Sequence, residues 1–143
     1  MMTTTDATGG LSVSFEFFPP KAGEAETTFW RTIAKLEPVH PSFVSVTYGA
    51  GGTTRDRTLA TVARIARETS LKPAAHLTCV GASKDEVNAV IREFRDAGVN
   101  HIVALRGDPP GGVGTRFVPH PEGYRNAADL VRGFNVDGFW PAL

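Results

Sequence analysis

Apolar runs recur along this chain at a nearly constant interval, and this repeat limits the folds that the chain can adopt. The runs begin near Val13, Phe43, Ala74 and His101. Their spacing of roughly 30 residues is the length of one strand–loop–helix unit. The runs are rich in Val, Ile, Phe and Thr, which is typical of buried parallel strands. The repeat therefore predicts an α/β fold with four parallel strands.

Helical patterns fill the intervals between these runs. Phe29, Ile33 and Leu36 form one apolar stripe, and that helix must end before Pro38. A second helix is indicated by the apolar stripe of Leu59, Val62 and Ile65 and by a capping box at Thr53 and Asp56. A third is indicated by Val87, Val90, Ile91 and Phe94, with a capping box at Ser83 and Glu86 and a terminating Gly98. A fourth, weaker helix is expected near Tyr124–Arg132. Strands and helices are therefore expected to alternate.

The positions of polar residues distinguish between the two folds that such a repeat can form, a (β/α)8 TIM barrel and a doubly wound sheet. Active sites of barrels lie at the C-terminal ends of the strands. Polar residues occupy the C-terminal end of every predicted strand, namely Glu16, Thr47, Tyr48, His76, Thr78, Arg106 and Asp108. The barrel is therefore favoured, but a complete one takes about 250 residues, whereas this chain has 143 residues. Four units make half a barrel.

Charge and cysteine content exclude several classes of protein. Lysine plus arginine number 15 and aspartate plus glutamate number 15, so the formal net charge is zero. Without a long basic run there is no electrostatic case for binding nucleic acid or a membrane surface. The single cysteine, Cys79, rules out an internal disulfide, and no apolar stretch is long enough to span a membrane. Residues 1–10 lack the features of a signal peptide, so a cytoplasmic protein is expected.

Two acids are the strongest candidates for chemistry. Glu16 lies in the middle of an aromatic strand, where an unpaired carboxylate is costly to bury as an anion and tends to take up a proton, as a general acid must. Its alternative is a strand acid that faces solvent or pairs with Arg106. Asp108 lies between Gly107 and Pro109, where a plain turn is the alternative to a functional role.

Other candidates carry weaker signals. His76 lies at a strand end, but a lone histidine is more often a hydrogen-bonded core residue, and without a second ligand at suitable spacing we predict no metal site. Cys79 is expected to be a small buried apolar residue. The glycine-rich segment 48–54 allows close approach of the backbone to a ligand and could present amides to a phosphate, although it matches neither a P-loop nor a dinucleotide-binding fingerprint.

Taken together, these segments resemble the bacterial methylenetetrahydrofolate reductases. Order and spacing both match over about residues 12 to 132. The matching segments are Ser14-Phe15-Glu16-Phe17-Phe18-Pro19-Pro20-Lys21, Phe43-Val44-Ser45-Val46-Thr47-Tyr48-Gly49-Ala50-Gly51-Gly52, Arg55-Asp56-Arg57-Thr58, His76-Leu77-Thr78-Cys79 and His101-Ile102-Val103-Ala104-Leu105-Arg106-Gly107-Asp108-Pro109-Pro110. This combination is far more specific than any single motif.

The resemblance implies a flavin enzyme of one-carbon metabolism and methionine supply. In such an enzyme NADH or NADPH reduces FAD, and methylenetetrahydrofolate then accepts the hydride. The resemblance makes Glu16 the general acid toward N10 of the folate and places Asp108 beside the flavin and pterin, where its charge offsets a developing positive charge. Positions that match cofactor-lining residues are Thr47, Tyr48, Ala50, His76, Arg106, Gly107, Asp108 and, more loosely, Ala127.

The resemblance also sets the expected domain limits. A disordered lead-in is expected at residues 1–11, the N-terminal half of a flavin-binding barrel at residues 12–133, and a divergent tail at residues 134–143. Four further units of the family are missing, so the chain alone is expected to be inactive and to self-associate, as a homo-oligomer or through exposed barrel edges. The alternatives are a non-catalytic half-barrel that binds a flavin or a partner, and a different barrel lyase. An aldolase is disfavoured because Lys72 precedes its strand.

Overall fold

The computed structural model describes residues 2–5, 10–49, 53–112 and 114–136. Five strands form one sheet in the order β1-β2-β3-β4-β5. The strands are β1 (Met2–Thr5), β2 (Leu11–Phe17), β3 (Phe43–Val46), β4 (Pro73–Thr78) and β5 (His101–Leu105). The helices are α1 (Glu24–Leu36), the short 3-10 helix η1 (Glu37–Val39), α2 (Arg55–Glu68), α3 (Lys84–Asp96) and α4 (Ala127–Val136).

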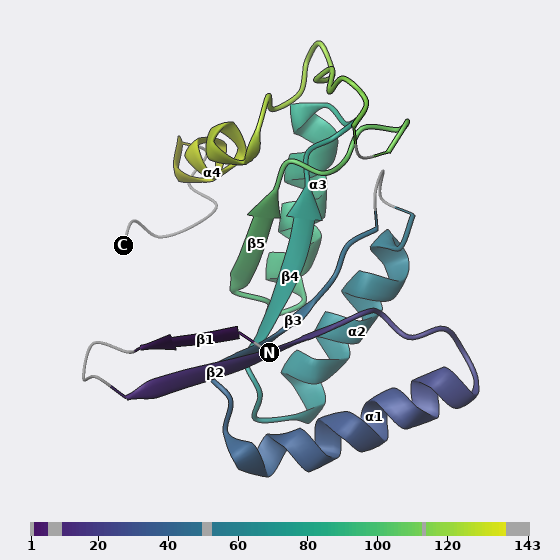
Figure 1. The fold of residues 1–143 in the computed structure, drawn as a ribbon, viewed down its shortest axis with the longest axis vertical. Coiled ribbons are helices and arrows are strands. Elements are labelled where there is room, and N and C mark those ends of the chain that lie inside the picture. The colour runs from purple at the N-terminus through teal and green to yellow at the C-terminus, as the bar shows by residue number, and fades with distance from the viewer. Residues whose placement is uncertain (1, 6–9, 50–52, 113, 137–143) are drawn as a thin grey trace.

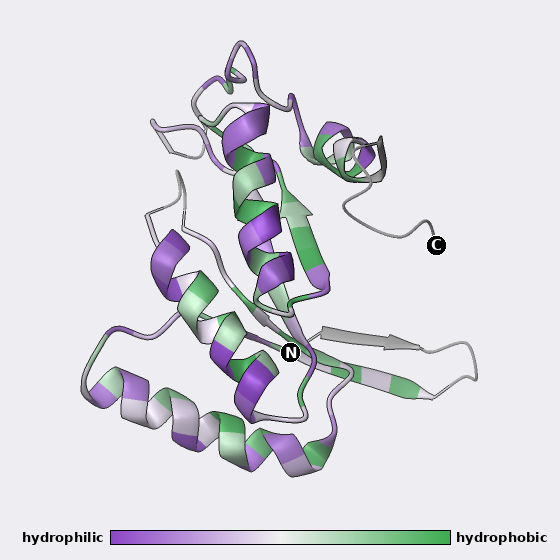
Figure 2. Ribbon diagram, turned by 180° about the vertical axis from the view of Figure 1, so that it is seen from behind, coloured by the Kyte–Doolittle hydropathy of each residue, from purple (hydrophilic) through white to green (hydrophobic). Residues whose placement is uncertain are grey.

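Strands β2 to β5 are parallel neighbours, and a helix follows each of them. Figure 1 shows this alternation along the chain, and Figure 2 shows α2 and α3 in front of the strands when the molecule is seen from behind. The four strand–helix units predicted from the repeat are confirmed. Sequential parallel pairing with helices on one face is the arrangement of half a (β/α)8 barrel.

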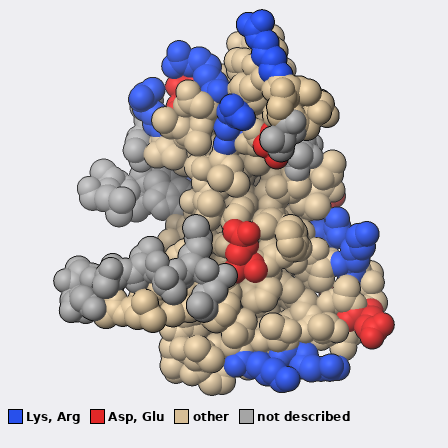
Figure 3. Space-filling view, in the orientation of Figure 1, with Lys and Arg blue, Asp and Glu red and all other residues tan. Residues whose placement is uncertain are grey.

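Alternation along each strand gives the sheet two different faces. Phe15, Phe17 and Val46 pack into the hydrophobic core, which the helices cover. Glu16 and Ser45 are paired in register and project to the opposite face, which corresponds to the inside of a barrel. Figure 3 looks onto this opposite face, where uncharged surface surrounds acidic atoms near the centre.

The core forms where the predicted apolar stripes of the helices meet the sheet. Ile33, Val62, Ile65 and Phe94 are each at most 1% exposed. The ring of Phe29 in α1 packs edge-on against that of Phe17 in β2, with centroids 5.3 Å apart. The stripes expected for the first three helices are therefore confirmed. No helix within the described ranges is long and apolar enough to cross a membrane.

Helix α3 begins with the capping box predicted from its sequence. The Ser83 hydroxyl accepts a hydrogen bond from the Glu86 amide, and the Ser83 amide donates to the Glu86 carboxylate. Gly98 follows the helix with φ +81, as expected for a helix-ending glycine.

The capping box predicted for α2 is wrong. Thr54, not Thr53, occupies the N-cap position, and its side chain makes no capping hydrogen bond. The Thr54 hydroxyl instead accepts a hydrogen bond from the amide of Gly49, at 2.7 Å. This hydroxyl therefore closes the turn between β3 and α2, and it also lies 3.3 Å from the Thr58 hydroxyl in the first turn of the helix.

The expected disordered lead-in is not entirely irregular. Residues Met2–Thr5 form β1, which pairs antiparallel with β2 from Met2↔Ser14 to Thr5↔Leu11. Threonine is β-branched and suits an extended strand, and β2 offers an otherwise open edge to it. The edge near Ser14, which was expected to be unpaired, is therefore covered.

Helix α4 extends further than expected. It begins at Ala127 and continues to Val136, so it includes the first residues of the segment 134–143 that was interpreted as a divergent tail. Leu130 is fully buried and Phe134 is 7% exposed, so both join the core. A Cβ at Gly133 would lie 2.5 Å from the Tyr124 ring, so the helix packs closely on that tyrosine. Residues 137–143 lie outside the described residues.

Candidate functional site

A pocket lies at the C-terminal ends of the central strands. Its volume is about 320 Å³, and its lining residues are Tyr48, Thr78, Leu105, Arg106, Gly107 and Asp108. The structure thus brings together four of the predicted site residues from two loops that are more than 50 positions apart in the sequence. Parallel strands end at one edge of the sheet, which is why these loops meet.

Gly107 determines how closely the Arg106–Asp108 turn approaches β4. Its φ is +85, and a Cβ added there would lie 2.4 Å from Cγ1 of Val80. Only glycine adopts this conformation without strain and leaves room for Val80. The Cys79 thiol lies behind the turn, 3.6 Å from the Arg106 carbonyl oxygen to which it donates. Burial raises the pKa of Cys79, in agreement with its predicted structural role.

Arg106 and Asp108 are both exposed, and no ion pair joins them within the part of the chain that the structure describes. The Arg106 guanidinium instead stacks on Phe117, with its carbon 4.4 Å from the ring centroid. The aromatic ring, and not the carboxylate of Asp108 or of Glu16, is therefore the neighbour of this guanidinium. Asp108 remains open to the pocket.

Glu16 differs from its expected environment. It was expected to be buried among aromatic rings, but its side chain is 51% exposed. The reason is the period of the strand: Phe15 and Phe17 turn toward the helices, and Glu16 turns to the opposite face. Its neighbour there is His76 of β4, whose Nε2 lies 3.2 Å from Oε2 of Glu16.

His76 is largely buried, with 9% of its side chain exposed. Burial lowers the pKa of His76, and the negative charge of Glu16 opposes this shift. Although the two side chains are close, their angle does not meet hydrogen-bond geometry, and Nε2 has no hydrogen-bond partner among the described residues. His76 is therefore not the satisfied core histidine that a lone histidine usually is.

Thr47 and Tyr48 lie where β3 leads into α2. The Thr47 amide donates to the Phe17 carbonyl at 2.9 Å, and the Thr47 carbonyl accepts from the Thr58 hydroxyl at 2.8 Å. These bonds hold the start of the turn between β3 and α2 against both β2 and α2. Tyr48 is half-buried, and burial raises its pKa. Ala50 lies outside the described residues.

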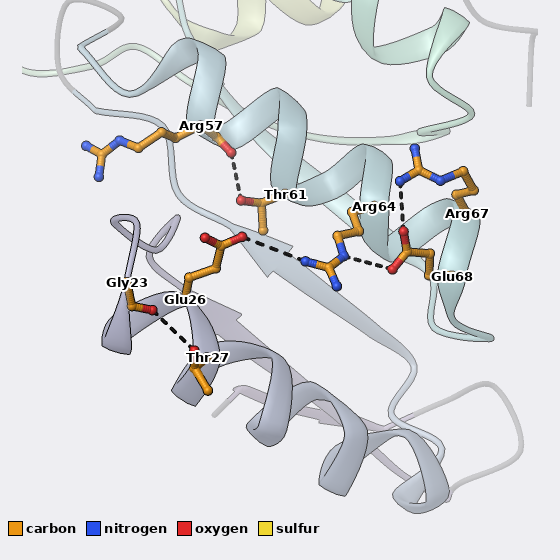
Figure 4. Close-up of polar contacts among 8 residues, drawn as sticks. All are labelled: Gly23, Glu26, Thr27, Arg57, Thr61, Arg64, Arg67 and Glu68. Carbon is orange, nitrogen blue, oxygen red and sulfur yellow. Dashed lines mark hydrogen bonds and ion pairs between the residues drawn. The ribbon is translucent and has the colours of Figure 1, made fainter.

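A larger groove, which sequence reasoning missed, lies beside Tyr48. It has a volume of about 840 Å³ and a mostly apolar wall, and its residues are Phe18, Pro19, Pro20, Lys21, Glu24, Ala25, Thr28, Phe29, Thr47, Tyr48, Gly49, Thr54 and Arg57. Figure 4 shows that the Arg57 side chain extends away from the ion pairs that Arg64 makes with Glu26 and Glu68. The signal that could have indicated this groove is Phe18, an aromatic residue next to two prolines that remains 80% exposed.

Ala127 is separate from the pocket. It is the first residue of α4, and it is not among the residues that line the space between Tyr48 and Asp108. Its neighbour Asp129 is held by Arg125, whose hydrogen bonds lower the pKa of Asp129 to about 2. Within the described ranges, no group of three or more His, Cys, Asp or Glu side chains could hold a metal ion.

Comparison with known proteins agrees with the family that the sequence resembles. Residues 1–138 match the protein-family model described as methylenetetrahydrofolate reductase. The 5,10-methylenetetrahydrofolate reductases of Salmonella typhimurium and Escherichia coli are 49% and 48% identical over 123 residues, which is 86% of this chain and 39% of each relative. An Arabidopsis thaliana protein named methylenetetrahydrofolate reductase (NADH) 1 is 35% identical over 86% of this chain and 21% of its own length. The chain thus spans about 39% of the length of the bacterial relatives that it matches.

Proposed function

The chain belongs to the methylenetetrahydrofolate reductase family, and we propose that it provides the first half of a barrel that reduces 5,10-methylenetetrahydrofolate to 5-methyltetrahydrofolate. NADH or NADPH would be the hydride donor. One observation supports this proposal above the others. Glu16 on β2 and Asp108 after β5 both lie toward the C-terminal ends of the strands, where barrel enzymes carry their active sites.

The two acids would have separate tasks. Glu16 would give its proton to N10 of the folate and so open the five-membered ring. Asp108 would remain ionised beside the pterin and stabilise the positive charge that develops there. Their surroundings differ in the way that such a division needs, because Glu16 lies against a buried histidine and Asp108 lines an open pocket.

The residues present fit part of a flavin. Tyr48 offers a half-buried ring with a hydroxyl, and Arg106 and Asp108 add an exposed cation and an exposed carboxylate to the same pocket. Thr47, Tyr48, Ala50, His76, Arg106, Gly107 and Asp108 would hold FAD here, with Ala127 as a looser match. When bound, the flavin supplies the hydride chemistry, and the protein supplies orientation and charge.

Flavin binding to the 143-residue chain tests the proposal. We expect weak but saturable quenching of FAD fluorescence, because only half of the pocket is present. Arg106→Gln should weaken this binding, whereas Arg116→Gln, an exposed arginine in the same loop, should leave it unchanged. No saturable quenching, or equal loss in both variants, would contradict the proposed site.

A second candidate function is a half-barrel that binds a flavin or a partner without turnover. It is favoured by the share of the relatives that the chain spans, 39%.

We also propose that the chain self-associates through the edge of β5, which among the described residues pairs only with β4. A cytoplasmic location remains part of the proposal because the single cysteine is buried and unpaired.

A further inference from the structure

Glu16 and His76 approach each other across an intervening strand. Glu16 lies on β2 and His76 on β4, with β3 between them. Alternate strands lie about 10 Å apart, yet Nε2 of His76 is 3.2 Å from Oε2 of Glu16. On the intervening strand, Ser45 is paired with Glu16 in register, and the register extended from Val46↔Ala75 places Thr47 beside His76. The two longer side chains therefore approach each other diagonally across β3.

The histidine atom in this contact is enclosed and unsatisfied. Nε2 is buried and has no hydrogen-bond partner among the described residues, although a carboxylate oxygen lies within reach. Buried polar atoms are nearly always paired, and an exception needs an explanation. A small rotation of the half-exposed Glu16 side chain would align the two groups, because Glu16 is free to move on its open side.

We propose that His76 is a positioning residue for Glu16 and that a proton taken up by the pair is shared between Nε2 and the carboxyl group. This inference rests on the proposed function of Glu16 as an acid. When Glu16 gives the shared proton to the substrate nitrogen, the pair is left as a neutral imidazole and a carboxylate. One proton taken up from the solvent buffer then restores it, and no other bond within the pair changes.

The surroundings of His76 support an exclusive pairing. Its neighbour on β5 is Val103, and the register extended from Val46↔Ala75 places Thr47 beside it on β3. The other titratable residue on this face of β5 is His101, which is exposed at the start of the strand. Arg106 and Asp108 lie beyond the strand ends, and Tyr48 lies in the turn that follows β3. Among the described residues, Glu16 is the only charged group that shifts the pKa of His76.

Nuclear magnetic resonance of the histidine-labelled chain tests the pairing. The chain has four histidines, so His76 can be assigned by elimination with His40→Gln, His101→Gln and His120→Gln, without altering His76 itself. Because the negative charge of Glu16 raises the pKa of His76, Glu16→Gln should lower the titration midpoint of His76. Asp108→Asn is the matched control, and it should leave the midpoint unchanged.

The two outcomes are distinct. A lowered midpoint in Glu16→Gln with no change in Asp108→Asn supports the pair. A midpoint that stays the same in Glu16→Gln, or that falls equally in Asp108→Asn, overturns it. The measurement requires neither flavin nor folate, so its failure would leave the proposed function standing. Conversely, failure of flavin binding would leave the coupling of Glu16 and His76 intact.

Discussion

Gly107→Ala tests how strongly the candidate site depends on a close approach of the backbone. The added Cβ would lie 2.4 Å from Cγ1 of Val80 and 3.0 Å from Cβ of Thr78, at a backbone φ of +85. A side chain in the left-handed region costs about 1–2 kcal/mol, and an extra methyl group in a packed contact costs about 1–3 kcal/mol. We therefore expect the free energy of unfolding to fall by about 2–5 kcal/mol.

Gly98→Ala is the matched control for this prediction. Gly98 has nearly the same backbone conformation, with φ +81, but nothing lies within 4 Å of an added Cβ. Its cost should be the conformational part alone, about 1–2 kcal/mol. Urea unfolding followed by circular dichroism, at several protein concentrations, measures both variants, and their m-values should be unchanged. Equal losses of stability in the two variants would refute the close approach at Gly107.

Three further predictions concern stability and association. Ser83→Ala should lower the free energy of unfolding, measured in urea, by about 1 kcal/mol because the capping box is lost. An unchanged free energy of unfolding would mean that the box contributes nothing. The stabilising contribution of Asp129 is complete above its ordinary pKa of 3.8 and is lost as the pH falls through about 2. Arg125→Ala should therefore make the free energy of unfolding depend less on pH in the acid range. An unchanged pH dependence would contradict this. Light scattering should show that the chain self-associates and that Val103→Lys, on the β5 edge, reduces this association. A monodisperse monomer would show that the β5 edge does not drive association.

The sequence alone predicts the order of the elements well and their ends less well. Apolar periodicity indicates β2–β5 and the first three helices because it follows directly from which face is buried. The capping box predicted at the start of α2 was wrong because the Thr54 hydroxyl accepts a hydrogen bond from the Gly49 amide. This contact crosses a turn, and no local sequence pattern shows it. Strand β1 was missed because its pairing partner, β2, supplies the stability that a short threonine segment lacks by itself.

The arrangement of the candidate site could also be predicted only in part from the sequence. Strand ends on the same sheet predict that Tyr48, Arg106, Gly107 and Asp108 converge, and the structure brings them into one pocket. The sequence could not show that Glu16 contacts His76, because that contact depends on two side chains meeting across an intervening strand. Nor could it show the groove beside Tyr48, which is formed by the packing of two loops on two helices.

Glu16 is proposed to supply a proton to the folate and to take no part in reducing the flavin. The direct test joins residues 12–133 to the remaining length of the Salmonella typhimurium relative, which is 49% identical over the shared part. Stopped-flow absorbance at about 450 nm follows the oxidised flavin in each half-reaction. Glu16→Gln should leave reduction by the nicotinamide largely intact and slow oxidation by methylenetetrahydrofolate by about 100-fold or more. Equal slowing of both half-reactions would contradict the account and show Glu16 to be structural.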